Sequence, residues 1–149
     1  MLAIMSTALR RVLDLMQIVA YARVQCECMR LSGARSSEIG PRRFDYQQRI
    51  EASVRELHAR QSAMSSDERS AVRLGRALFL RLLLSSASQR LDAWCDSETL
   101  DTMPPSHLLE WVAYDDERTE LAEVESAMTP EEAVLYARAR IHLASQEPI

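Results

Sequence analysis

The residues best suited to covalent chemistry are Cys95 and His107, which flank the same break between two helical segments. A cysteine nucleophile needs a nearby base to take its proton, and a third group to orient that base. Structural cysteines and surface histidines are far commoner than such pairs. No serine lies in the strand–turn–helix context of a nucleophile elbow. We therefore expect no catalytic residues.

The sequence offers no arrangement typical of a metal or cofactor site. Cys26 and Cys28 are two residues apart, which on a helix places them on different faces. His107 and Glu110 share a helix face, but a di-iron site in a bundle needs two Glu-x-x-His pairs and two further carboxylates. The three glycines are too dispersed to form a phosphate-binding loop. The sequence therefore predicts no metal, no cofactor and no enzymatic activity.

Charge is distributed unevenly along the chain. All 18 basic residues are arginines, and they lie mainly in the first part: residues 1–90 hold 15 Arg and 8 acidic residues. Residues 91–149 hold 3 Arg and 14 acidic residues. Such asymmetry between two parts of a chain indicates a role in interaction.

Two charged surfaces are candidates for binding a partner. The basic set is Arg35, Arg42, Arg43 and Arg49, and the acidic set is Asp115, Asp116, Glu117 and Glu120. The basic set would suit nucleic acid or an acidic protein, and the acidic set would suit a basic protein. In a third interpretation, the acidic helix packs beside the basic ones and the charges meet at the rim. The isoelectric point of about 5.4 and the absence of a nucleic-acid-reading motif argue against nucleic acid.

The elements that must carry these residues are helices. Apolar residues in 2–31 recur at alternating spacings of three and four, which predicts one buried helix face. That face comprises Leu2, Met5, Leu9, Val12, Met16 and Val19, and is widened by Leu13, Ala20, Val24 and Leu31. Gly33 is a natural stop, and residues 33–43 are rich in Gly, Pro and Ser, which predicts a loop.

Two further helices follow this loop. The second is expected over residues 42–64, and Ser65 with Glu68 has the pattern of a capping box that begins a third helix over 66–94. The centre of the third helix is apolar on almost every side, as expected of a helix surrounded by others. We therefore expect its large side chains to be mostly buried: Leu78, Phe79, Leu82 and Leu83.

The last part of the chain contains two more helices. Residues 95–105 break the pattern, and Ser106 is expected to cap a helix over 106–128. Thr129 and Pro130 followed by two glutamates give the clearest helix start, for a fifth helix to about residue 144. Its spacing predicts an inward face made of Val134, Ala137 and Ile141.

Together these patterns predict an all-α fold, a single-domain bundle of about five helices over residues 1–149, with a central apolar helix near residues 66–94. The most apolar stretch, residues 77–84, is interrupted by Arg81 and is far shorter than the roughly 20 residues that span a bilayer. No signal-peptide pattern is present, so we expect a cytoplasmic protein with reduced thiols and no membrane association.

The favoured function is a non-enzymatic protein-binding or regulatory module, such as an inhibitor, adaptor, immunity protein or chaperone, whose partner is another protein. One alternative is a small nucleic-acid-associated regulator that uses the Arg-rich second helix. Another is an enzyme or metal protein whose site is assembled from distant residues. Homo-oligomerisation is compatible with all three.

Overall fold

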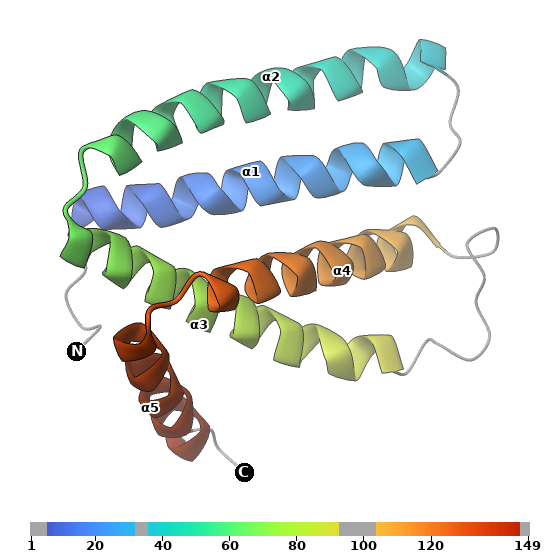
Figure 1. The fold of residues 1–149 in the computed structure, drawn as a ribbon. Helices are drawn as coiled ribbons and strands as arrows, with labels where there is room; N and C mark the ends of the chain where they lie inside the picture. The colour runs from blue at the N-terminus through green and yellow to red at the C-terminus, as the bar shows by residue number, and fades with distance from the viewer. Residues whose placement is uncertain (1–5, 32–35, 93–103, 147–149) are drawn as a thin grey trace.

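A computed structural model of the chain describes residues 6–31, 36–92 and 104–146, which form five α-helices and no strand (Figure 1). The helices are α1 (Thr7–Leu31), α2 (Ser36–Ser62), α3 (Ser66–Asp92), α4 (Pro105–Ser126) and α5 (Pro130–Gln146). The predicted all-α bundle of five helices is confirmed. None of the helices in these ranges is both long and apolar enough to cross a membrane.

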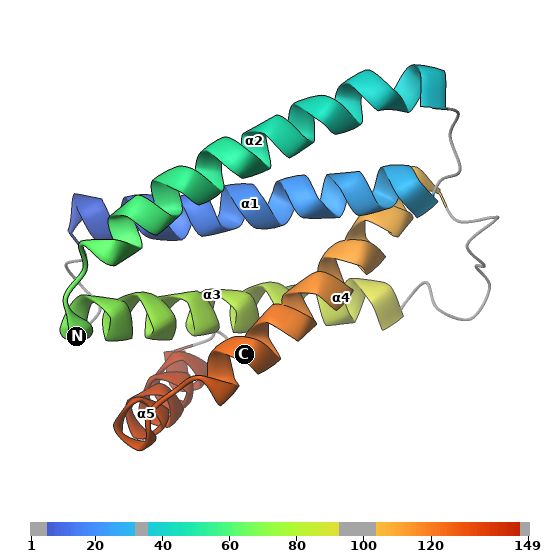
Figure 2. The ribbon, with the colours of Figure 1, turned by 45° about the horizontal axis from the view of Figure 1, so that its top comes forward.

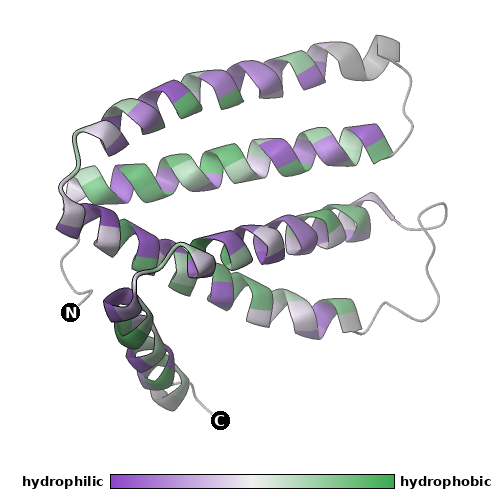
Figure 3. Ribbon diagram, in the orientation of Figure 1, coloured by the Kyte–Doolittle hydropathy of each residue, from purple (hydrophilic) through white to green (hydrophobic). Residues whose placement is uncertain are grey.

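The helices are arranged around α1 and α3. α1 and α2 form an antiparallel hairpin, α4 packs on both α3 and α1, and α5 packs on α3. Figure 2 shows α4 crossing α3 obliquely, and α5 lying at a steep angle to the other helices. Hydrophobic and hydrophilic residues alternate along the helices, as expected where each helix buries one face (Figure 3).

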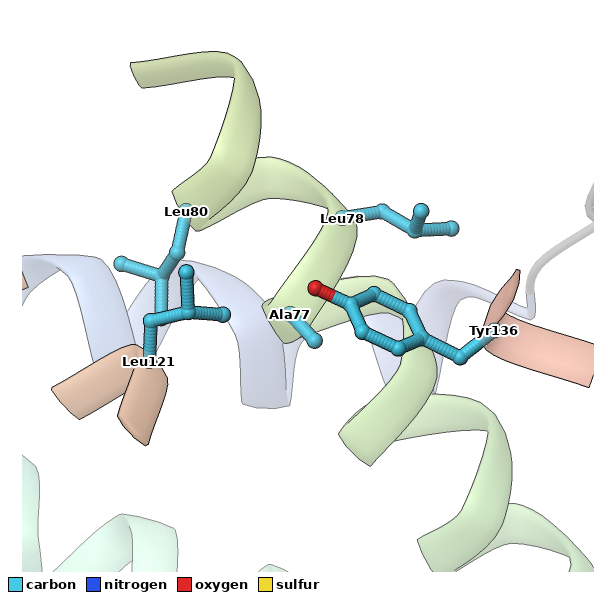
Figure 4. Packing of buried hydrophobic residues seen from close by; sticks show 5 residues of the cluster. All are labelled: Ala77, Leu78, Leu80, Leu121 and Tyr136. Atoms are coloured by element: carbon cyan, nitrogen blue, oxygen red, sulfur yellow. The ribbon is translucent and has the colours of Figure 1, made fainter. Parts of the chain in front are cut away.

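The core has two main clusters. In one, Tyr136 of α5 reaches across to Ala77 and Leu78 of α3, while Leu80 of α3 meets Leu121 of α4 (Figure 4). The other brings α1 against the start of α3 and consists of Leu9, Val12 and Val72. Both clusters include residues of α3, which contacts α1, α4 and α5, so α3 lies at the centre of the bundle together with α1.

The predicted buried face of α1 is largely confirmed. Its buried residues are Leu9, Val12, Leu15, Val19, Ala20, Ala22 and Val24. Leu15 and Ala22 were not on the predicted face, whereas Leu31, predicted on it, is 38% exposed at the end of the helix. Leu2 and Met5 lie outside the described residues.

Two helix starts follow the predicted local chemistry. The Ser65 hydroxyl accepts from the Glu68 backbone N–H at 3.2 Å, and the Glu68 carboxylate accepts from the Ser65 N–H at 3.0 Å. The Thr129 hydroxyl accepts from the Glu132 N–H at 3.2 Å. These bonds satisfy backbone donors that have no partner within the helix, so they fix where α3 and α5 begin.

Two other boundaries differ from the prediction. α2 begins at Ser36, so residues 36–41 are helical rather than part of a loop, and Pro41 lies inside the helix. A proline in the second turn removes one backbone bond near the helix start, which costs less than a proline at the centre. α4 begins at Pro105, because proline has the backbone angle and the missing donor that suit the first helical position. Ser106 is therefore not the cap.

The prediction for the large side chains of α3 is wrong for two of the four. Leu78 is 5% exposed, but Phe79 and Leu82 are 42% and 49% exposed. Leu83 is half-buried. α3 is covered by α1, α4 and α5 over only part of its circumference, so its uniformly apolar sequence does not make it surrounded on all sides.

The predicted inward face of α5 is also wrong. Val134 and Ile141 are 52% and 71% exposed, and Ala137 is exposed as well. The buried face is instead formed by Glu132, Tyr136, Ala139 and Leu143, which have the same three-and-four spacing. This second row faces the core because Tyr136 packs on α3 and because its hydroxyl accepts a hydrogen bond from Arg81.

Candidate functional site

The basic and acidic parts of the chain meet where the helices pack against one another. Arg76 of α3 is 2% exposed and donates two hydrogen bonds to the carboxylate of Glu120 on α4, one of them 2.7 Å long. It donates a third, of 2.9 Å, to the side-chain amide oxygen of Gln17 on α1. Four more pairs join arginines of α1 or α3 to acids of α4 or α5: Arg23–Asp116, Arg73–Glu132, Arg81–Glu125 and Arg90–Glu110. Much of the charge asymmetry therefore serves contacts between helices.

The acidic candidates have different surroundings. Glu120 is held by Arg76, and Asp116 lies 3.3 Å from the guanidinium of Arg23. Asp115 is exposed and pairs at 3.4 Å with Arg118, also exposed and one helical turn away. Such exposed pairs contribute little to stability. Asp115 is therefore the most available acidic candidate for a partner.

Glu117 lies on another side of α4 and is half-buried. Burial raises the pKa of its carboxyl to about 6, with further upward contributions from Asp116 and Glu120, while Arg76 opposes the rise. The partly buried position of Glu117 thus disfavours the charged form of its carboxyl.

Glu117 should make the protein less stable as pH rises from about 4.5 to 6. Below the ordinary value of 4.5 both the folded and the unfolded chain carry the proton, so no penalty exists. Above about 6 the folded state must hold the charge in a poorly solvated position. Glu117→Gln should therefore raise the free energy of unfolding by about 1 kcal/mol at pH 7, allowing for solvent screening, and not at pH 4. Urea unfolding at several pH values measures this.

Glu125→Gln is the control of opposite sign. Burial favours the protonated form, but hydrogen bonds from Arg81 and Tyr136 outweigh it and lower the pKa of Glu125. Its charge therefore stabilises the fold at neutral pH, and Glu125→Gln should reduce stability at pH 7. A Glu117→Gln protein no more stable than the wild type at pH 7 would contradict the role assigned to Glu117.

The basic candidates lie on α2. Arg42, Arg43 and Arg49 are all exposed, and Arg49 stacks over Tyr46 at 5.5 Å from the ring centre. Arg35 lies outside the described residues. The first half of α2 thus presents several arginines to solvent.

A groove runs between α2 and α4, with α1 as its floor. It comprises two neighbouring cavities of about 630 and 330 Å³, both lined by Arg23, Asp116 and Thr119. The other lining residues are Met16, Val19, Val24, Cys26, Glu27 and Leu31 of α1; Arg43, Gln47, Ile50 and Leu57 of α2; and Leu108, Trp111, Val112, Asp115, Glu120 and Glu123 of α4. From Met16 to Leu31 the floor extends about 22 Å, or four helical turns.

This groove brings together residues from both predicted surfaces. Arg43 of the basic set lies on the α2 wall of the first cavity, which Asp115 and Asp116 of the acidic set also line from α4. Glu120 of the acidic set lines the second cavity. Arg42, Arg49 and Glu117 do not line it. Two charged surfaces that the sequence presents as alternatives therefore border one groove.

Sequence reasoning missed the apolar part of the groove. The spacing of apolar residues along residues 42–64 and 106–128 predicts that Ile50 and Trp111 face inward, yet both line the groove and are only half-buried. Their inward spacing was the available signal. The spacing within one helix could not show that α2 and α4 both pack on α1 and leave a groove between them.

Two free thiols lie on α1, and one of them, Cys26, lines the groove. The free thiols Cys26 and Cys28 are half-buried, and burial raises the pKa of Cys28, which keeps that thiol protonated at neutral pH. Across the described ranges, no three His, Cys, Asp or Glu residues are grouped to hold a metal ion. Cys95 lies outside the described residues, so the expectation that Cys95 and His107 form no catalytic pair stays a prediction. We compared the chain with protein-family models, curated proteins and solved structures, and none of them matches it.

Proposed function

We propose that this chain is a non-enzymatic protein-binding module of the cytoplasm, and that it holds part of another protein in the groove between α2 and α4. The observation that carries the proposal is an open groove whose floor and walls combine apolar side chains with charged ones. Apolar contacts supply affinity, and the charges at the rim select the partner and speed its approach. An inhibitor, an adaptor, an immunity protein and a chaperone all act by such binding.

The charge of the groove favours a protein over a nucleic acid. Its lining contains five carboxylates, from Glu27, Asp115, Asp116, Glu120 and Glu123, and two guanidinium groups, from Arg23 and Arg43. A phosphate backbone would be repelled by this excess of negative charge. The alternative, a nucleic-acid-associated regulator, would have to use exposed arginines of α2 that do not line the groove, such as Arg42 and Arg49.

Site-specific photo-cross-linking in the source cell tests the proposal. Gln47 is exposed on the α2 wall of the groove, and its neighbour Gln48 is exposed on α2 but does not line it. A photoreactive residue at position 47 should yield a discrete protein adduct, and one at position 48 should not. Adding Ile50→Asp, which places a charge on the apolar lining, should abolish the adduct.

Two results would contradict the proposal. Equal adducts from positions 47 and 48, or none from position 47, would show that the groove does not hold a protein. An adduct that nuclease removes would instead support the nucleic-acid regulator. Circular dichroism of each variant, with an unchanged helical spectrum, excludes misfolding as the reason for a lost adduct.

A further inference from the structure

We infer that the occupant of the groove is an amphipathic helix of the partner protein, about four turns long, with two basic residues about two turns apart along the edge that faces α4. This inference rests on the proposed function and specifies the partner of the same site.

The shape of the groove fits a helix. α2 packs on α1, and α4 packs on α1 and α3, so the groove is bounded by helices on its floor and both walls. Its lining spans Met16 to Leu31 on α1, Arg43 to Leu57 on α2 and Leu108 to Glu123 on α4, each about four turns. A helix lying along it would contact α1, α2 and α4 and would complete a second bundle around α1.

The apolar lining calls for an apolar face on the occupant. Val24 and Leu31 come from the floor, Ile50 and Leu57 from the α2 wall, and Trp111 from the α4 wall. Trp111 is half-buried and is positioned by Tyr114, whose ring meets it edge-on with 6.3 Å between centroids. A large aromatic side chain held in place in this way is typical of residues that dominate binding energy. The occupant should therefore present aliphatic residues at spacings of three and four.

The positions of the carboxylates on the α4 wall indicate where the occupant should carry basic residues. Asp116 and Glu120 are already engaged by Arg23, at 3.3 and 3.9 Å. Asp115 and Glu123 are both exposed, and Asp115 pairs with the exposed Arg118. They are eight residues apart on α4, or about 12 Å. Two basic residues seven or eight positions apart on the occupant would reach both carboxylates.

A peptide selection tests this inference directly. A library of displayed 18-residue helical peptides is selected against the full chain and counter-selected against its Ile50→Asp variant. The enriched peptides should share an apolar face and carry Lys or Arg at positions seven or eight apart along one border of that face. Binding is then measured from the fluorescence of Trp111, in a Trp94→Phe background so that a single tryptophan reports.

Charge variants show whether the α4 wall is used. Asp115→Asn with Glu123→Gln should weaken binding of the enriched peptide by about tenfold at low salt, and by less at high salt. Glu131→Gln, at an exposed position of α5 that does not line the groove, should leave binding unchanged. Replacing the two basic residues of the peptide with Glu should weaken binding at least as much as the double variant does.

Several results would overturn the inference. Enriched peptides without an apolar face or without basic residues would exclude this occupant, as would a failure to enrich any peptide. If the position 47 adduct is still formed in either case, the groove binds a protein of another shape and the proposed function stands. Concentration-dependent dimerisation that Ile50→Asp abolishes would identify a second copy of this chain as the occupant instead.

Discussion

Arg76→Ala should lower the free energy of unfolding by about 3–5 kcal/mol, the largest effect expected of a single substitution among the charged residues that the structure describes. Arg76 is 2% exposed and satisfies both oxygens of the Glu120 carboxylate and the amide oxygen of Gln17. Removing the guanidinium leaves the Glu120 charge, which is largely screened from solvent, without its main partner. Urea denaturation at pH 7 measures the change.

Two companion variants separate the loss of a buried pair from a general effect of charge. Arg118→Ala breaks the pair with Asp115, in which both side chains are mostly exposed, and should change stability by less than about 0.5 kcal/mol. The double variant Arg76→Met, Glu120→Met removes both charges together and should be far closer to the wild type than Arg76→Ala. A cost below about 1 kcal/mol for Arg76→Ala would mean that water reaches this pair.

Leu80→Ala should destabilise the protein by about 2–5 kcal/mol, whereas Leu82→Ala should cost less than about 1 kcal/mol. The two leucines lie on the same helix, but Leu80 is 0% exposed and packs in the cluster with Leu121, while Leu82 is 49% exposed. Truncating Leu80 opens a cavity in the main cluster, and truncating Leu82 removes atoms that are already partly in water. Thermal or urea unfolding of the pair provides an internally matched comparison.

An equal loss from both leucine variants would contradict the packing of α3 described above. It would mean that Leu82 is covered in solution, and stability would then depend on protein concentration if a second copy covers it. Neither leucine lines the α2–α4 groove, so both variants should still bind the selected peptide while folded.

The sequence alone determined the features that depend on near neighbours. The starts of α3 and α5 can be predicted because the Ser65, Glu68 and Thr129 caps act across only three residues. The helical fold followed from apolar spacing along the whole chain. The start of α2 was missed because Gly33 and Pro41 look like loop residues, although a proline in the second turn is tolerated.

Which face each helix buries was decided by its neighbours. On α5, the rows containing Val134 and Tyr136 have the same spacing, so periodicity could not choose between them. The row that contains Tyr136 is buried because it packs against α3. Similarly, the apolar sequence of α3 could not show that Phe79 and Leu82 lie where no other helix covers them fully.

The uneven distribution of charge can be seen in the sequence, but which charged residues pair with one another cannot. Arg76 and Glu120 are 44 residues apart, and only the packing of α4 on α3 brings them together and removes Glu120 from the set of freely available charges. The sequence assigns Arg43 and Asp115 to two separate surfaces. In the structure, α2 and α4 both pack on α1, so the two residues lie on opposite walls of one groove. Local patterns act over a few residues and fix the helices, whereas a groove exists only where helices from distant parts of the chain pack side by side without closing the space between them.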